Sequence, residues 1–460
     1  MQYANIIGGL DIYLNSIQFN NDIEQLFDGS NNPLGLIYHL SFVTQFNNAI
    51  QPKQNSPQFN LHIQQNIANP QINPGLNPNI FNNRSVIQNS NMTKITMSIT
   101  KDFNAHPLIG LQSIGNFPNY MNSVIQCFCQ TKKFVNYFKY NKDIEKTIDK
   151  YNKNNKFCLT NSFKIIIENL WPSDIKYINK KFCHENNSNK YFAPYEQLKD
   201  INRDFQSPLD LINYIIINLH EELNKKKLEN NSFNDNIIMP DQSNKEAMLN
   251  FFIQNFKKEY NSFIRDNFYG TNLTQFECLN CKLKRYDYSI YSYLLFSLEE
   301  VIKFKQNNLM MNNINSLSIE DCFKFNQRNE ILSGDDAIPC SKCNLIYPSN
   351  NCTFIFTAPE ILILIFDPMQ RLNIKFEISL ELNLYNFIKE VKTGYKFNLI
   401  GIVLKLGGLG MNEYFIACCK SPIDNCWYKY NNDFVSRIDN IQGYLINPGF
   451  PYILFYEKTN

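Results

Sequence analysis

Two C-x-x-C pairs constrain the fold of this chain more than any other feature. They are Cys278-Leu-Asn-Cys281 and Cys340-Ser-Lys-Cys343. Each pair lets two thiolates bind one metal ion from a tight turn, and two such turns complete the tetrahedral four-sulfur shell that zinc prefers. The chain must therefore fold so that two distant turns meet. Because four thiolates leave no open coordination position, we expect a structural Zn²⁺. The alternative is that these are free buried thiols.

A second organising stretch is Gly110 to Phe138, where a tight turn runs into an amphipathic helix. Apolar residues recur there with the spacing of one buried helical face, at Met121, Val124, Ile125 and Phe128. A cysteine at the start of this helix would have its thiolate stabilised by the helix dipole. The chain has Asn119 at that position, and asparagine is a good N-cap residue.

The same stretch resembles the cysteine box of the ubiquitin-specific proteases, G-L-x-N-L-G-N-T-C-Y-M-N-S followed by a helix with Gln. The family's catalytic cysteine falls on Asn119, and its oxyanion-hole asparagine falls on Ser113. One extra residue lies between Asn116 and Tyr120. The matching residues are Gly110, Leu111, Gly115, Asn116, Tyr120, Met121, Asn122, Ser123 and Gln126.

The family's second box, G-H-Y-x-A-Y and then W-Y-x-F-[DN]-D-x-x-V, resembles residues 413–418 and 427–435. The catalytic histidine of the family falls on Tyr414, and the residue that orients the histidine falls on Asn431. None of the five histidines follows His220, so none lies in the part of the chain that should supply the base. Tyrosine, with an ordinary pKa of about 10, is a poor base at neutral pH.

These substitutions predict that the chain is not an enzyme, since cysteine-protease chemistry needs both a thiolate and a base. Cys127 and Cys129 are the nearest candidates for a relocated nucleophile, but they lie two turns into the helix, where the dipole effect has faded. We expect a catalytically inactive protein of this type that acts as a scaffold or ubiquitin-binding subunit. The alternative is an active cysteine-type deubiquitinase, a ubiquitin C-terminal thiol hydrolase, that uses unrecognised residues.

Composition and periodicity divide the chain into three parts. Residues 1–50 form an N-terminal arm or small appended element, and residues 51–100 form a linker rich in Asn, Gln and Pro. Residues 101–460 form one domain, with helical patterns up to about residue 260 and strand patterns from about residue 276. This order predicts an α+β fold. The resemblance implies a papain-like fold with a helical thumb (about 107–265), zinc-binding β fingers (about 266–355) and an antiparallel-sheet palm (about 356–460).

The partners expected are proteins of a larger assembly, with ubiquitin as a weak ligand. In the family, a D-x-x-[DE]-F pattern holds the basic tail of ubiquitin. Here Asp210 keeps the second acid and Ser207 replaces the first, and the strand motif L-K-R-F reads Phe366-Asp367-Pro368-Met369. These changes favour a structural role slightly over ubiquitin binding.

Charge and hydropathy exclude other classes of partner. A net charge of +2 gives no support for nucleic acid. The first residues lack a basic segment with a long apolar core, and the apolar runs are too short to span a bilayer. Unpaired scattered cysteines suit a reducing compartment. We therefore expect a soluble intracellular protein without membrane insertion, cytoplasmic or nuclear, with the cytoplasm slightly preferred.

Overall fold

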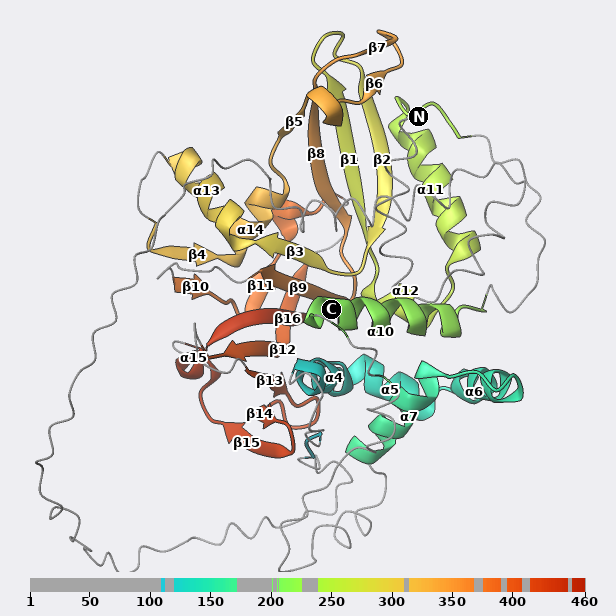
Figure 1. Cartoon of the computed structure of the whole chain (residues 1–460), viewed down its shortest axis with the longest axis vertical. Helices are drawn as coiled ribbons and strands as arrows, with labels where there is room; N and C mark the ends of the chain where they lie inside the picture. Colours follow the sequence, from blue (N-terminus) through green and yellow to red (C-terminus); the bar gives the residue numbers. More distant parts are fainter. Residues whose placement is uncertain are drawn as a thin grey trace, which may run out of the picture.

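The computed structural model describes residues 109–111, 120–171, 201, 205, 207–225, 239–309, 314–367, 375–389, 395–407, 414–445 and 449–459. The predicted N-terminal arm and linker, residues 1–100, lie outside these ranges. Figure 1 shows a group of helices against one side of a large sheet, and a second sheet that projects from the body. No helix in the described ranges is long and apolar enough to cross a membrane.

The first helix in the described part of the chain is α4 (Tyr120–Gln130), which is almost wholly buried and packs against strands β12 (Lys396–Leu406) and β13 (Tyr414–Lys420). Ser207, Asn244 and Ser262 each accept a hydrogen bond from the backbone N–H three residues further on, so each is the N-cap of the helix that follows. The helices are α4 (Tyr120–Gln130), α5 (Lys132–Tyr140), α6 (Asp143–Lys153), α7 (Leu159–Leu170), α10 (Pro208–Leu223), α11 (Lys245–Glu259) and α12 (Phe263–Phe268).

The larger sheet has eight strands in the order β15-β14-β13-β12-β16-β9-β3, with β11 also paired to β12. The pairs are antiparallel except for β3 and β9, which run parallel. Its strands are β3 (Leu294–Ser297), β9 (Ile361–Asp367), β11 (Glu381–Asn383), β12 (Lys396–Leu406), β13 (Tyr414–Lys420), β14 (Trp427–Asn431), β15 (Phe434–Ile438) and β16 (Phe450–Lys458).

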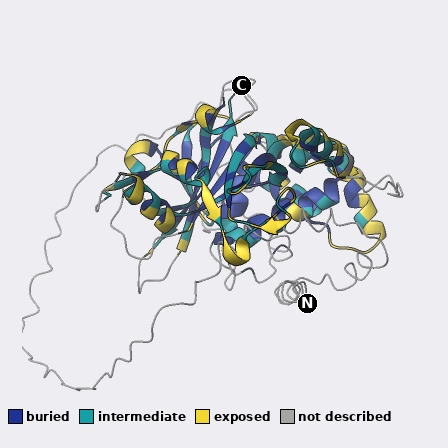
Figure 2. Ribbon diagram, turned by 90° about the horizontal axis from the view of Figure 1, so that it is seen from above, coloured by how far each residue is buried: buried dark blue, intermediate teal, exposed yellow. Residues whose placement is uncertain are grey.

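Both faces of this sheet are covered, which explains why β9 is apolar at six consecutive positions. Ile361, Ile363 and Ile365 join the core formed with α4, α5, α7 and α10. Leu362, Leu364 and Phe366 join the core on the opposite face, formed with α13 (Leu298–Leu309) and α14 (Ile319–Asn326). Figure 2 shows the buried strands between these layers, with exposed residues on the outer helices.

The projecting sheet has the strand order β2-β1-β8-β5, and α11 packs against β2 through a small core that includes Phe252 and Tyr288. Its strands are β1 (Gly270–Cys278), β2 (Lys284–Tyr291), β5 (Glu330–Leu332) and β8 (Ser349–Thr357). At its far end β6 (Pro339–Cys340) and β7 (Leu345–Ile346) form a short hairpin. The short strands β4 (Ser316–Ser318) and β10 (Lys375–Glu377) pair in parallel, and α15 (Ile441–Tyr444) lies near β15.

The predicted α+β class is confirmed, with helices first and an antiparallel sheet after them. Two helices, α13 and α14, lie in the region expected to be mostly strand. Their start signals are local: Glu299 and Glu300 occupy the first turn of α13, and Ser318 with Asp321 forms a capping box at α14. Because this region is rich in aromatic and β-branched residues, its composition predicted strands, and the two helices were missed.

Candidate functional site

The structure brings the four cysteines of the two C-x-x-C pairs together. Their sulfur atoms all lie within 4.8 Å of one another. The Sγ atoms of Cys278 and Cys343 are 3.9 Å apart, and those of Cys281 and Cys340 are 3.5 Å apart. Zn–S bonds of about 2.3 Å in a tetrahedron place sulfurs about 3.8 Å apart, so the four thiols fit Zn²⁺. The predicted zinc cofactor is supported by a closed, structural four-sulfur site.

The two turns are built alike. The N–H of Lys282 donates to the carbonyl of Cys278 over 2.9 Å, and the N–H of Asn344 donates to the carbonyl of Cys340 over 2.8 Å. Lys282 and Asn344 both have positive φ, 59° and 53°, which turns the chain back after the second cysteine. Backbone N–H groups of Cys343 and Lys342 donate toward Cys340 and lower the pKa of its thiol to about 6, whereas, opposed by Asn280, burial and the other three thiols raise the pKa of Cys343 to about 12.

The segment that precedes α4 is fixed to the turn between β14 and β15. The N–H of Leu111 donates to the carbonyl of Asn432 over 3.1 Å. The Asn122 amide, on α4, donates to Asn432 Oδ1 over 2.9 Å and to the carbonyl of Leu111 over 3.3 Å. Gly110 is needed for this close approach, since a Cβ there would lie 2.2 Å from the Asn432 carbonyl oxygen.

The predicted triad positions are only partly described. Asn119 and Ser113 lie outside the described residues. Asn431 is exposed at the end of β14, and its neighbour Asn432, with φ of 53°, makes the contacts to α4. Sequence reasoning missed Asn432, although Asn-Asn-Asp between two strands signals a turn in which asparagine takes a left-handed conformation.

Tyr414 begins β13 and is 41% exposed. Strand alternation places its side chain on the same face as Ile416 and Cys418, which belong to the core away from α4. Phe415 is on the other face, and its ring packs edge-on against Tyr120 at the start of α4, with ring centroids 5.7 Å apart. The residue of β13 that meets the start of α4 is therefore Phe415.

Five residues from the ends of α4, α10, β9, β13 and β16 form what we call the strand-end cluster: Tyr120, Asp210, Asp367, Phe415 and Tyr452. The rings of Phe415 and Tyr452 lie 6.0 Å apart, edge to face. Burial, together with the negative charges of Asp367 and Asp210, raises the pKa of Tyr452 to about 12. Both carboxylates therefore lie within electrostatic range of one phenol.

The two acids of the cluster are held by different means. Asp210 is in the first turn of α10, where its N–H donates to Ser207 Oγ over 3.2 Å. Asp367 is the last residue of β9, and partial burial together with the nearby Glu299 raises the pKa of its carboxyl. Sequence reasoning named Asp210 and noted Asp367 only as a change from the family motif.

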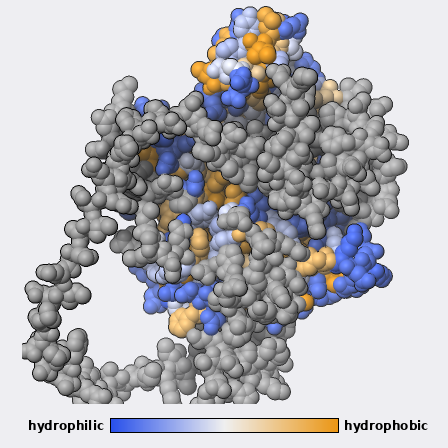
Figure 3. Space-filling model, viewed as in Figure 1, coloured by the Kyte–Doolittle hydropathy of each residue, from blue (hydrophilic) through white to orange (hydrophobic). Residues whose placement is uncertain are grey.

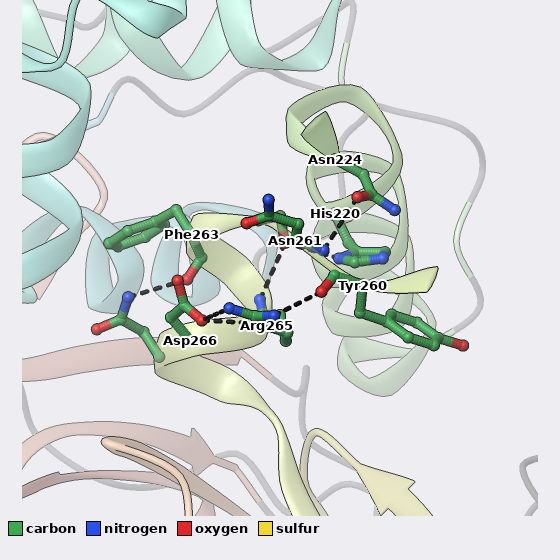
Figure 4. Close-up of polar contacts among 9 residues, drawn as sticks. His220, Asn224, Tyr260, Asn261, Phe263, Arg265 and Asp266 are labelled. Carbon is green, nitrogen blue, oxygen red and sulfur yellow. Dashed lines mark hydrogen bonds and ion pairs between the residues drawn. The ribbon is translucent and has the colours of Figure 1, made fainter. Parts of the chain in front are cut away.

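His220 is buried in the helical part of the chain. Its Nδ1 lies 2.7 Å from Ser262 Oγ, and its ring packs against both Tyr260 and Tyr269 at centroid distances of 5.0 and 5.3 Å. Figure 4 shows it beside Asn224 and Tyr260, near the ion pair of Arg265 with Asp266.

The cysteines of the helical part are buried as well. Cys127 Sγ on α4 lies 3.7 Å from Cys419 Sγ on β13. Cys158 Sγ lies 3.5 Å from Glu222 Oε2, and burial, reinforced by this carboxylate, raises the pKa of the Cys158 thiol to about 12. The Cys158 thiol is therefore not activated as a nucleophile in this conformation.

A protein-family model described as "Ubiquitin carboxyl-terminal hydrolase" matches residues 109–456. The chain belongs to this family. Usp2 of Drosophila melanogaster, a ubiquitin carboxyl-terminal hydrolase, is 24% identical over 392 residues, which cover 82% of this chain and 38% of the relative. Ubiquitin carboxyl-terminal hydrolase 2 of Homo sapiens is 22% identical over 376 residues, which cover 77% of this chain and 56% of the relative. The chain thus spans 38% to 56% of the length of these relatives.

Solved structures have the same fold. A structure of the yeast SAGA DUBm superimposes with a TM-score of 0.52 and 18% identity, covering 78% of this chain and 70% of that one. A structure of the SAGA DUB module with Ubp8, Sgf11, Sus1 and Sgf73 gives a TM-score of 0.50 and 19% identity, covering 76% and 69%. The family resemblance and its thumb, palm and fingers architecture, with four cysteines at the fingers, are thereby confirmed.

The prediction that this chain is not an enzyme is wrong. The family and the curated relatives are named as hydrolases. The prediction rested on the substitutions at Asn119 and Tyr414, on the absence of a histidine after His220, and on the position of Cys127 and Cys129 within the helix. One of these positions, Asn119, lies outside the described residues, and the domain retains other cysteine and histidine side chains, among them Cys158 and His220.

Proposed function

We propose that this chain binds ubiquitin and acts on ubiquitin conjugates, with the basic ubiquitin tail held at the strand-end cluster. The observation that carries this proposal is the pair of carboxylates, Asp210 and Asp367, that both perturb Tyr452. One carboxylate comes from the helical part and the other from the palm sheet, so the cluster combines acids from both parts of the domain.

The chemistry of the cluster suits an extended basic segment. Arginine side chains make charge-assisted hydrogen bonds to carboxylates, which are about twice as strong as neutral ones. The rings of Tyr120, Phe415 and Tyr452 provide apolar walls against which a narrow segment can pack. Tyr120 is fixed for this role because its hydroxyl donates to the carbonyl of Phe205 over 2.6 Å.

The reaction proposed for the bound conjugate is the one for which the family is named, hydrolysis at the carboxyl terminus of ubiquitin. Since Cys127 and Cys158 are both buried here, the experiment has to identify the reacting residue. We also propose that the chain works within a larger protein assembly in the cytoplasm or nucleus, as the solved SAGA modules are assemblies of several proteins.

Two measurements test the proposal. Calorimetric titration of ubiquitin onto the full chain should give saturable binding. Asp210→Asn and Asp367→Asn should each weaken it roughly tenfold, because each removes one charge-assisted contact. Glu381→Gln, at an exposed acid on β11, is the matched control. Absence of binding by the unmodified chain would refute the proposal.

A ubiquitin probe with a carboxyl-terminal vinyl electrophile tests the reaction. Covalent capture, followed by peptide mass spectrometry, would name the nucleophile. Ubiquitin binding without capture would retain recognition of ubiquitin and refute cysteine-dependent hydrolysis.

A further inference from the structure

The outer corner of the palm sheet carries a pocket that is distinct from the strand-end cluster. It has a volume of about 290 Å³ and is lined by Lys429 of β14, by Ser436, Arg437 and Ile438 of β15, and by Asp439, Asn440 and Tyr444 around α15. Tyr444 forms one side and packs against the core cluster that contains Cys418 of β13. This side of the pocket is thus tied to the sheet.

Lys429 supplies the charge of the pocket. It is half-buried and lies directly opposite Ser436 in the β14–β15 ladder, so the ammonium group and the hydroxyl share one face. No carboxylate in the described ranges lies within ion-pair distance of Lys429. The one acid at the rim, Asp439, is paired with Arg437, with Nε and Oδ1 3.5 Å apart. The unneutralised charge of the pocket is positive.

The pocket adjoins a free sheet edge. β15 is the last strand of the eight-stranded sheet, and no strand in the described part of the chain pairs with its outer side. An unpaired edge presents backbone N–H and C=O groups that an extended segment can bind.

We propose that this edge and pocket form a docking site for an extended acidic segment of a partner protein. The segment adds as a strand to β15 and places a Glu or Asp carboxylate on Lys429 and Ser436. Charge complementarity selects the acidic side chain, and the free edge selects an extended backbone. The site is separate from the ubiquitin site proposed above, so each can fail without the other.

The test uses the full chain and a fluorescein-labelled peptide of alternating glutamate and valine, with a glutamine-for-glutamate peptide as comparison. We expect fluorescence anisotropy to show binding of the glutamate peptide, weakened roughly tenfold or more by Lys429→Gln and restored by Lys429→Arg. Lys396→Gln, at an exposed lysine on β12, should change nothing. Hydrogen exchange should slow in β15 when the peptide is bound.

Three outcomes would overturn the proposal. Equal binding of the glutamine peptide would remove the role of the carboxylate. Unchanged binding by Lys429→Gln would remove the role of the pocket. Inorganic phosphate that displaces the peptide while β15 shows no slowed exchange would indicate a simple anion site and no strand addition.

Discussion

Exchange of Cys278 and Cys340 for serine should release the metal and unfold the fingertip, which we define as the two C-x-x-C turns with β6 and β7. This region has almost no apolar core of its own. Leu345 and Ile346 are 59% and 63% exposed, as is Ile331 on the neighbouring strand β5 at 62%, and the far end of the projecting sheet shows apolar surface in Figure 3. Burial of apolar area therefore contributes little to holding the fingertip together.

The size of the effect follows from comparing the cost of ordering the fingertip with the interactions that hold it. Ordering the backbone costs about 1–2 kcal/mol per residue, whereas each backbone hydrogen bond returns about 1 kcal/mol net. The β6–β7 ladder spans only two residue pairs. Structural zinc supplies about 10–16 kcal/mol in zinc-finger peptides, which is enough to offset the ordering cost. The two large cores on the faces of the palm sheet contain none of the four cysteines, so the loss should remain local.

Metal analysis and hydrogen exchange by mass spectrometry measure the effect. The unmodified chain should carry one tightly bound Zn²⁺, and the double variant none. Exchange should become fast between β6 and β7 and stay slow in β9 and β16. Cys426→Ser, at a half-buried cysteine away from the fingertip, is the control. A metal-free chain whose fingertip stays protected from exchange would refute the reasoning.

Two further predictions concern stability. Gly110→Ala should lower it by about 1–3 kcal/mol, because the new methyl meets the backbone of Asn432 at 2.2 Å; an unchanged melting temperature would contradict this. Asp321→Asn should lower the free energy of unfolding by about 1–2 kcal/mol at neutral pH. The Asp321 carboxylate accepts a hydrogen bond from the N–H of the N-cap residue Ser318 and pairs with Lys305 over 2.7 Å. Although burial opposes it, the pKa of Asp321 is lowered by these contacts, so their stabilisation is present above about pH 4 and lost as the pH falls through the folded-state pKa. Urea midpoints of the two proteins should therefore converge in acid, and a constant difference would refute this assignment.

The sequence predicted the elements whose signals are local. The helical stripe from Met121 to Phe128 and the apolar run at β9 are both present, because each pattern is set by a buried face. The cysteine spacing predicted the meeting of two distant turns, since four paired thiols have few other uses.

The site could be predicted less well, because it depends on contacts between distant strand ends. No pattern in the sequence shows that Phe415 rather than Tyr414 meets Tyr120, since this follows from which face of β13 is turned to α4. The anchoring role of Asn432 likewise depends on a contact to Asn122, far away in the chain. The prediction of inactivity was drawn from sequence positions alone, and the family and the curated relatives, which are named as hydrolases, contradict it.

Ser207 and Asp367 show how the charge of the proposed ubiquitin site is arranged. In the sequence, Ser207 stands where the family motif has an acid, and Asp367 stands where the L-K-R-F motif has a basic residue. Both changes argue against ubiquitin binding. In the fold, Ser207 caps α10 and so fixes the turn that carries Asp210, while Asp367 places a carboxylate within electrostatic range of the same tyrosine. The cluster thus has one acid on the helix and one on the sheet. We therefore expect the double variant Asp210→Asn, Asp367→Asn to lose more ubiquitin affinity than either single change, by about the product of the two effects if the contacts are independent. A double variant no weaker than Asp210→Asn alone would show that Asp367 contributes nothing.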